Sequence, residues 1–165
     1  MPLTEDDRDL VEAFRMFVED TIANDDRYGP LTRSDREDES ILVSWFEAGP
    51  GCWLEVAVHP TVPRVCIGFL TDDRSTSEGI KEAIQESDQS LRDFVVAGLR
   101  EAGLDWTDPP VEHNDNNGDG PFHFTTPVDI EEIPDLERDE NRSRVLRLLE
   151  GYLIAFGEAI MLEEE

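Results

Sequence analysis

The sequence almost lacks lysine. Lys81 is its single lysine, and arginines make up the rest of its 14 cations, against 40 aspartate and glutamate residues in a chain of 165. Ordinary soluble proteins use lysine freely and keep acidic and basic residues in rough balance. A formal net charge of −26 therefore indicates a surface adapted as a whole to its solvent. With no basic run to displace the counterions of DNA or RNA, we expect no direct binding of nucleic acid.

Long apolar runs are also missing. No stretch approaches the roughly 18 apolar residues of a membrane-spanning helix, so we expect no membrane role. The opening residues 1–7 are acidic and lack the charged and then apolar layout of a secretory signal, which favours the cytoplasm. The composition resembles that of cytoplasmic proteins from extremely halophilic archaea that accumulate salt.

Cysteine is scarce, and its placement argues against a disulfide. Cys52 shares strand parity with Leu54 and Val56, whereas Cys66 lies between the apolar positions Val65 and Ile67. The two side chains are thus expected on opposite faces of neighbouring strands, where a bridge would require the backbone to move. We predict two free thiols.

Signatures of catalysis are missing as well. The sequence has no Gly-x-Ser-x-Gly and no Gly-Lys-Ser/Thr, so neither an activated serine nor a phosphate-binding loop is indicated. A pair of carboxylates for acid–base chemistry cannot be singled out among forty. These absences favour a protein that is not an enzyme.

Apolar periodicity nevertheless predicts an ordered fold, in one domain spanning residues 1–165. Spacings of three and four residues predict helices, and alternation predicts strands. Thr4 precedes three acids and is the expected N-cap of the first helix. The predicted elements are a helix at 5–24, strands at 40–47, 52–59 and 64–70, a helix at 77–102 closed by Gly103, a hairpin within 104–129 and a helix at 138–162.

This order, α-β-β-β-α-β-β-α, predicts an α+β fold with an antiparallel sheet of about five strands and helices packed on it in two layers. Residues 25–39 are expected to form a polar loop that is mobile in part, and residues 163–165 are expected to fray. Pro109 and Pro110 cannot donate to a strand ladder, so the first arm of the late hairpin should be broken or lie at a sheet edge.

The tip of that hairpin carries the sharpest motif. Asp115, Asn117 and Asp119, followed by glycine, match the first half of a calcium-binding EF-hand loop. The second half does not match, because Thr126 stands where a bidentate glutamate is needed. A solvated turn, in which Asn, Asp and Gly are the usual residues, is the alternative.

Two histidines flank the same tip. His113 and His123, with Asp115 or Asp119, would suit a transition metal if the hairpin brought them together. The alternation of His123 with Phe122 and Phe124, however, predicts that its imidazole faces away from the buried side.

Aromatic residues around the first hairpin suggest a binding surface. If Leu54 and Val56 face the helices, Trp53 lies on the opposite face of the sheet. Trp45, Phe46 and Trp53 are then candidates for contacting a protein or peptide, because aromatic residues on an uncovered sheet face often mark a partner surface. The alternative is that a helix or loop of the chain covers them.

The element order resembles the secretion-chaperone-like fold group, which includes type III secretion chaperones and YbjN-like relatives. The stretches that carry the resemblance are 53–58, 64–70 and 122–126, followed by a helix with Leu149, Tyr152 and Phe156. Members of this group are non-catalytic and commonly dimeric, and the chaperones hold extended polypeptide on apolar grooves. The loop at 25–39 and the Pro109-Pro110 break depart from the compact pattern.

The resemblance implies a non-catalytic, chaperone-like module that binds protein or peptide without a cofactor, and that could form a homodimer. The alternative is a small metal-dependent enzyme or metal-binding protein that uses the hairpin of residues 113–123.

The net charge of −26 predicts that stability depends on salt. The melting temperature should rise steeply from dilute buffer to molar KCl, because the Debye length falls from roughly 30 Å at 0.01 M to about 3 Å at 1 M. Apolar burial supplies the opposing attraction, and salting-out strengthens it. Thermal melts across this range measure the effect; a midpoint that is flat from about 0.05 to 2 M KCl would contradict a halophilic adaptation.

Overall fold

The structure is a computed structural model that describes residues 4–25, 28–38, 40–49, 52–71, 78, 79, 82, 85, 86, 91–104, 111–114 and 122–164. Six antiparallel strands form one sheet in the order β1-β2-β3-β4-β6-β5. The strands are β1 (Leu31–Arg33), β2 (Leu42–Gly49), β3 (Cys52–His59), β4 (Arg64–Thr71), β5 (Glu112–Asn114) and β6 (Phe122–Asp129). The helices are α1 (Glu5–Ala23), α3 (Leu91–Glu101) and α4 (Asp139–Glu164), with a short 3-10 helix η2 (Ile133–Glu137).

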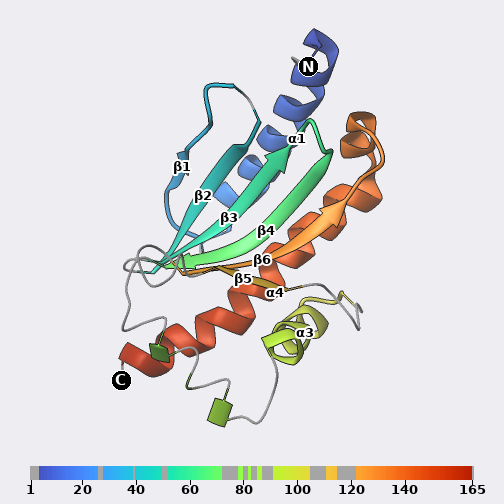
Figure 1. Cartoon of the computed structure of the whole chain (residues 1–165). Helices are drawn as coiled ribbons and strands as arrows, with labels where there is room; N and C mark the ends of the chain where they lie inside the picture. Colours follow the sequence, from blue (N-terminus) through green and yellow to red (C-terminus); the bar gives the residue numbers. More distant parts are fainter. Residues whose placement is uncertain are drawn as a thin grey trace.

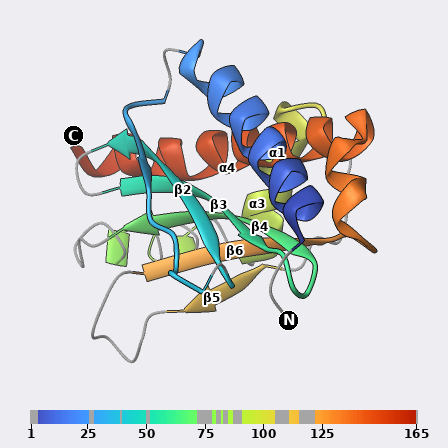
Figure 2. The same cartoon turned by 90° about the horizontal axis from the view of Figure 1, so that it is seen from above.

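The helices α1 and α4 cover one face of the sheet, and α3 packs on α4 (Figure 1). Seen from above, the sheet and the helices form separate layers (Figure 2). The predicted α+β fold with an antiparallel sheet is therefore confirmed. β2, β3 and β4 pair in succession as expected, and β6 pairs with β4 along its whole length.

One expectation for the segment 25–39 is wrong. Residues 31–33 form β1, which pairs with β2 through Leu31 opposite Phe46 and Arg33 opposite Ser44. All three residues of β1 are exposed, so the strand has no buried face and no apolar alternation to reveal it. Backbone pairing at the edge of the sheet stabilises it instead. The Pro109-Pro110 break and most of the predicted helix before Leu91 lie outside the described residues.

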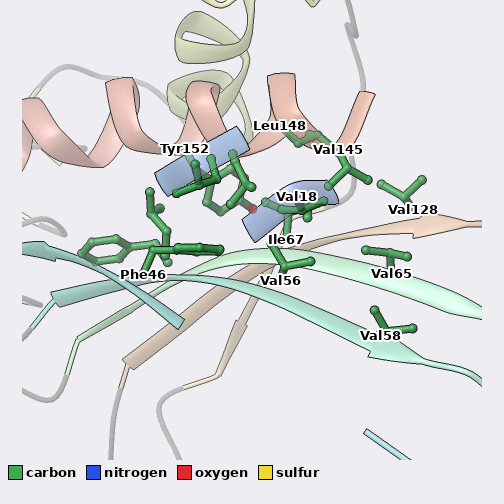
Figure 3. Close-up of a cluster of buried hydrophobic side chains, with 14 of the residues drawn as sticks. Val18, Phe46, Val56, Val58, Val65, Ile67, Val128, Val145, Leu148 and Tyr152 are labelled. Carbon is green, nitrogen blue, oxygen red and sulfur yellow. The ribbon is translucent and has the colours of Figure 1, made fainter. Parts of the chain in front are cut away.

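The core lies between the sheet and the helices. Figure 3 shows Val56 and Ile67 of the strands facing Leu148 and Tyr152 of α4. The ring of Phe156 stacks on Phe69 at a centroid distance of 4.7 Å. Burial of this kind contributes about 25 cal/mol per Å² of apolar surface, and it is the attraction that opposes the repulsion between the carboxylates.

The first helix begins as predicted. The backbone N–H of Asp7 donates to the Thr4 side chain at 3.1 Å, which makes Thr4 the N-cap. Val11, Phe14, Val18 and Ile22 are buried. Phe17 of the same helix is 36% exposed, and the guanidinium carbon of Arg142 lies 4.8 Å from the centroid of its ring.

The helix α3 also ends at the predicted glycine. Gly103 has a φ of +88°, the left-handed region that favours glycine after a helix. The N–H of Leu104 donates to the carbonyl of Leu99 at 2.8 Å, and the N–H of Gly103 donates to that of Arg100 at 3.0 Å. In the described part of the chain, no helix combines the length and the apolar run that crossing a membrane requires.

The two cysteines are free, as predicted. Cys52 is paired in register with Thr71, and Cys66 with Ala57. Cys52 is buried in the core, whereas Cys66 is half-buried and lies on the face that α1 and α4 do not cover.

Helices α3 and α4 approach closely where glycines meet. A Cβ at Gly98 would clash with the carbonyl oxygen of Gly151 and would lie 2.9 Å from Cβ of Ala155. A Cβ at Gly151 would in turn lie 3.0 Å from Cα of Leu99. No side chain fits between the two backbones at this crossing.

We predict that Gly98→Ala destabilises the protein by about 1 to 3 kcal/mol through overpacking, although alanine improves helix propensity by about 1 kcal/mol. The exposed neighbour Ala97 supplies the control, because Ala97→Gly should show only the ordinary propensity loss of about 1 kcal/mol. Urea unfolding in 2 M KCl measures both. A Gly98→Ala variant more stable than the parent would contradict the close crossing.

Candidate functional site

The face of the sheet opposite the helices carries the candidate site. Alternate residues of a strand point to opposite faces, so Trp45, Trp53, Glu55 and His123 all lie on this side. Trp45 is paired in register with Glu55. Among the described elements, no helix covers this face (Figure 2). We refer to it as the open face.

The predicted aromatic surface is present in part. The rings of Trp45 and Trp53 lie side by side on the open face, with centroids 6.5 Å apart, and both side chains are half-buried. Phe46 does not join them. It is 1% exposed and packs edge-on against Tyr28 in the core, because it has the opposite strand parity. The parity of Phe46 with Leu42 could have revealed this from the sequence.

A hollow of about 500 Å³ opens beside Trp45. Strands β2, β3, β4 and β6 form its floor, and residues 34–36 with Ile41 form a wall. The residues that line it are Ser34, Asp35, Arg36, Ile41, Val43, Trp45, Glu55, Ala57, His59, Arg64, Cys66, His123 and Thr125.

Glu55 is the central polar group of the hollow. It is only 5% exposed, and burying a carboxylate is costly unless its oxygens are hydrogen-bonded. The indole N–H of Trp45 donates to Oε1 at 3.2 Å, and Nε2 of His123 hydrogen-bonds Oε2. The carboxylate therefore fixes the orientation of both rings.

A glycine in β4 lies beside this contact. Gly68 lies between Glu55 of β3 and Thr125 of β6 in the register. A Cβ at position 68 would lie 2.6 Å from the carbonyl oxygen of Phe124 and 2.8 Å from Cγ2 of Thr125, whereas its distance of 3.5 Å from Nε2 of His123 is an ordinary contact. The close approach of β6 to β4 is therefore what requires glycine here.

The wall of the hollow is held by an ion pair with α1. The guanidinium of Arg15, which is 4% exposed, donates to both carboxylate oxygens of Asp35 at 3.0 and 2.9 Å. The N–H of Val43 also donates to Asp35, at 3.0 Å. Burial raises the pKa of Asp35, but the hydrogen bonds and charge of Arg15 outweigh it, and the pKa lies below its ordinary value. The next residue, Arg36, is thereby placed at the rim of the hollow.

A second set of ion pairs ties β1 to α1. Arg33 donates to Glu19 at 2.9 and 2.7 Å and to Glu12 at 3.2 and 3.0 Å. The hydroxyl of Ser44 donates to Glu19 at 2.8 Å. Burial raises the pKa of Glu19, and the hydrogen bonds from Arg33 and Ser44 then lower it below its ordinary value.

Two arginines and a second histidine also line the hollow. His59 is paired in register with Arg64, and Arg36 lines the same hollow. Burial lowers the pKa of His59, the charges of Arg64 and Arg36 lower it further, and Glu55 opposes them. The two arginines of the hollow stand against Asp35 and Glu55, so its lining is balanced in charge within a chain of charge −26.

The predicted metal site lies mostly outside the described residues. Asp115, Asn117 and Asp119 lie outside them. The register places position 113 opposite Phe124 and position 123 opposite Asn114, so the two histidine positions alternate instead of facing each other. In the described residues, no group of three or more His, Cys, Asp or Glu side chains could hold a metal ion. The metal-dependent alternative for residues 113–123 stays a prediction.

Glu55 has the same strand parity as Trp53 and therefore the same outward direction, but sequence reasoning missed its role. A single acid in the middle of the apolar strand 52–59 was the available signal, whereas its contact with His123, 68 residues away, had none. Arg36 and Arg64 were missed because they are separated in sequence and become neighbours only through the fold.

No family model, curated protein or solved structure matches the chain. What the open face binds is therefore inferred from its own residues.

We predict that His123→Ala destabilises the protein by about 1 to 3 kcal/mol, because Glu55 loses a hydrogen-bond partner while staying buried. In a Glu55→Gln background the same change should cost less, since a neutral amide is easier to bury. Urea unfolding of the four variants gives a double-mutant cycle, and its coupling free energy should be about 0.5 to 3 kcal/mol. Purely additive effects would contradict the pairing; His59→Ala, in the same hollow, is the control.

Proposed function

We propose that this protein is a non-catalytic, chaperone-like module of a halophilic cytoplasm that holds a polypeptide segment of a partner protein on the open face. The observation that carries the proposal is the pair Trp45 and Trp53. They lie half-buried beside the hollow, on the face of the sheet that α1 and α4 leave bare.

The chemistry of the face suits a peptide. Tryptophan offers a large apolar surface, and it is enriched among the residues that dominate binding energies. The volume of about 500 Å³ lies within the range of roughly 300 to 1,000 Å³ typical of binding pockets. Glu55 adds a buried acceptor, next to which a backbone N–H of the ligand can be placed.

The order of helices and strands supports the same proposal, because it resembles the secretion-chaperone-like group, whose chaperones hold extended polypeptide. That group is commonly dimeric, so a second copy of the chain is the other occupant to be tested. The sequence has no motif of an activated nucleophile or phosphate-binding loop, which favours binding over catalysis.

The test is selection from a random peptide library of about 12 residues against the protein in 2 M KCl, a condition under which its charges are screened. Selected peptides should bind with a Kd that rises at least about tenfold on Trp45→Ala or Trp53→Ala, as expected for an interface residue of this type. Met16→Ala is the matched control, because Met16 is an apolar side chain 51% exposed on α1, and it should leave the Kd unchanged.

Two results would overturn the proposal. One is a failure to select any peptide that depends on the tryptophans. The other is a dimer, measured by sedimentation, that Trp45→Ala dissociates and Met16→Ala does not; the occupant of the open face would then be a second copy of the chain.

A further inference from the structure

The central strands of the open face have backbone partners on both sides. β3 pairs with β4 along its whole length and with β2 from Cys52 to Val58, and β4 pairs with β6 along its whole length. A polypeptide that lies on this face therefore adds no hydrogen bond to the ladder of these strands. Its own N–H and C=O groups must be satisfied by water or by side chains, because a buried backbone group without a partner is costly.

The side chains of the hollow suit a ligand carbonyl better than a ligand N–H. Both oxygens of Asp35 and both of Glu55 are already hydrogen-bonded within the protein. Arg36 and Arg64 line the same hollow, and a guanidinium that serves a neighbouring acid with two of its five N–H donors still has others. A ligand with several carbonyl oxygens and few N–H groups matches this lining, and Glu55 is the place for a single ligand N–H.

The two tryptophans differ in the use of their donors. Their rings lie side by side with centroids 6.5 Å apart, and the indole N–H of Trp45 donates to Glu55. In the described part of the chain, by contrast, the half-buried Trp53 makes no side-chain hydrogen bond. Its indole N–H is therefore available to a ligand carbonyl, beside two apolar rings.

The charge of the hollow favours an uncharged ligand. Its two arginines are balanced by its two carboxylates. Burial and the charge of Arg64 lower the pKa of His59, so this imidazole is mainly neutral at pH 7. A charged segment would lose its hydration here without gaining a counter-ion of its own. An uncharged segment complements the hollow, within a chain of net charge −26.

We propose that the segment held on the open face is rich in proline and binds in the polyproline II conformation, with its rings against Trp45 and Trp53 and one carbonyl accepting from the indole N–H of Trp53. The inference rests on the proposed function for its polypeptide ligand. Proline is uncharged, lacks an N–H and carries an apolar ring, as the charge balance, the engaged acceptors and the tryptophans require. Polyproline II has no internal hydrogen bonds and is ordered before binding, so little conformational freedom is lost.

Two acetylated and amidated peptides of about eight residues test the proposal in 2 M KCl, where charges are screened. One is Pro-Pro-Ala-Pro-Pro-Ala-Pro-Pro, and the other has Val-Thr in place of each Pro-Pro. The proline peptide should bind at least about tenfold more tightly, because it buries fewer N–H groups without acceptors. Trp53→Phe keeps a ring but removes the donor, and it should raise the Kd of the proline peptide about three- to tenfold, the effect of one hydrogen bond. Met16→Ala is the control and should leave the Kd unchanged.

NMR gives a second readout of the same complex. On binding of the proline peptide, the indole N–H signal of Trp53 should shift more than that of Trp45, whose acceptor stays in place. An equal Kd for the parent and the Trp53→Phe protein, with no shift of the Trp53 signal, would overturn the hydrogen bond to the ligand carbonyl.

The outcomes separate this inference from the proposed function. Equal or tighter binding of the valine–threonine peptide, with dependence on both tryptophans, overturns the preference for proline and keeps the open face as a peptide site. No binding of either peptide up to about 20 mM, well above the Kd of a millimolar complex, overturns the inference, while selection from the library decides the proposed function. A dimer that Trp53→Ala dissociates overturns both, because a second copy of the chain would then cover the face.

Discussion

Packing of one face of the sheet against α4 is the interaction on which the rest of the structure depends. Ile67, Phe69, Tyr152 and Phe156 have almost no exposed surface, and this apolar contact must outweigh the mutual repulsion of a chain with a net charge of −26. Because side chains alternate along a strand, the same packing commits the intervening residues to the other side. The residues of the open face and its hollow are therefore those that alternate along the strands with the residues of the core.

Two arginines hold backbone segments in place. Arg15 fixes segment 34–41 through Asp35, and Arg33 fixes β1 through Glu12 and Glu19. Neither segment has an apolar face of its own to bury. Ion pairs of this kind contribute modestly when exposed, but Arg15 is buried, so its loss would leave Asp35 without its counter-ion at the wall of the hollow.

The sequence predicted the elements with a buried periodic face and missed those without one. The strands 52–59 and 64–70 and the helix capped by Thr4 follow from alternation and capping, and each is found close to its expected limits. β1 has no such signature, since its residues are all exposed and it is held by pairing with β2 and by the ion pairs of Arg33. Likewise, the outward direction of Trp53 was predictable from local parity, whereas the meeting of Glu55 with His123 depends on the order of the strands in the sheet.

The choice of arginine over lysine follows from the number of acceptors each cation must serve. Arg33 bridges Glu12 and Glu19, and Arg15 reaches both oxygens of Asp35, the carbonyl of Val43 and the hydroxyl of Ser44. A guanidinium has five donors in a rigid plane, whereas an ammonium is a point charge on a flexible stem. The molecule has almost three acids for every cation, so an arginine that binds several acceptors acts as a cross-link between segments. Replacing each of these arginines with lysine would keep the charge but lose the hydrogen bonds that join the segments.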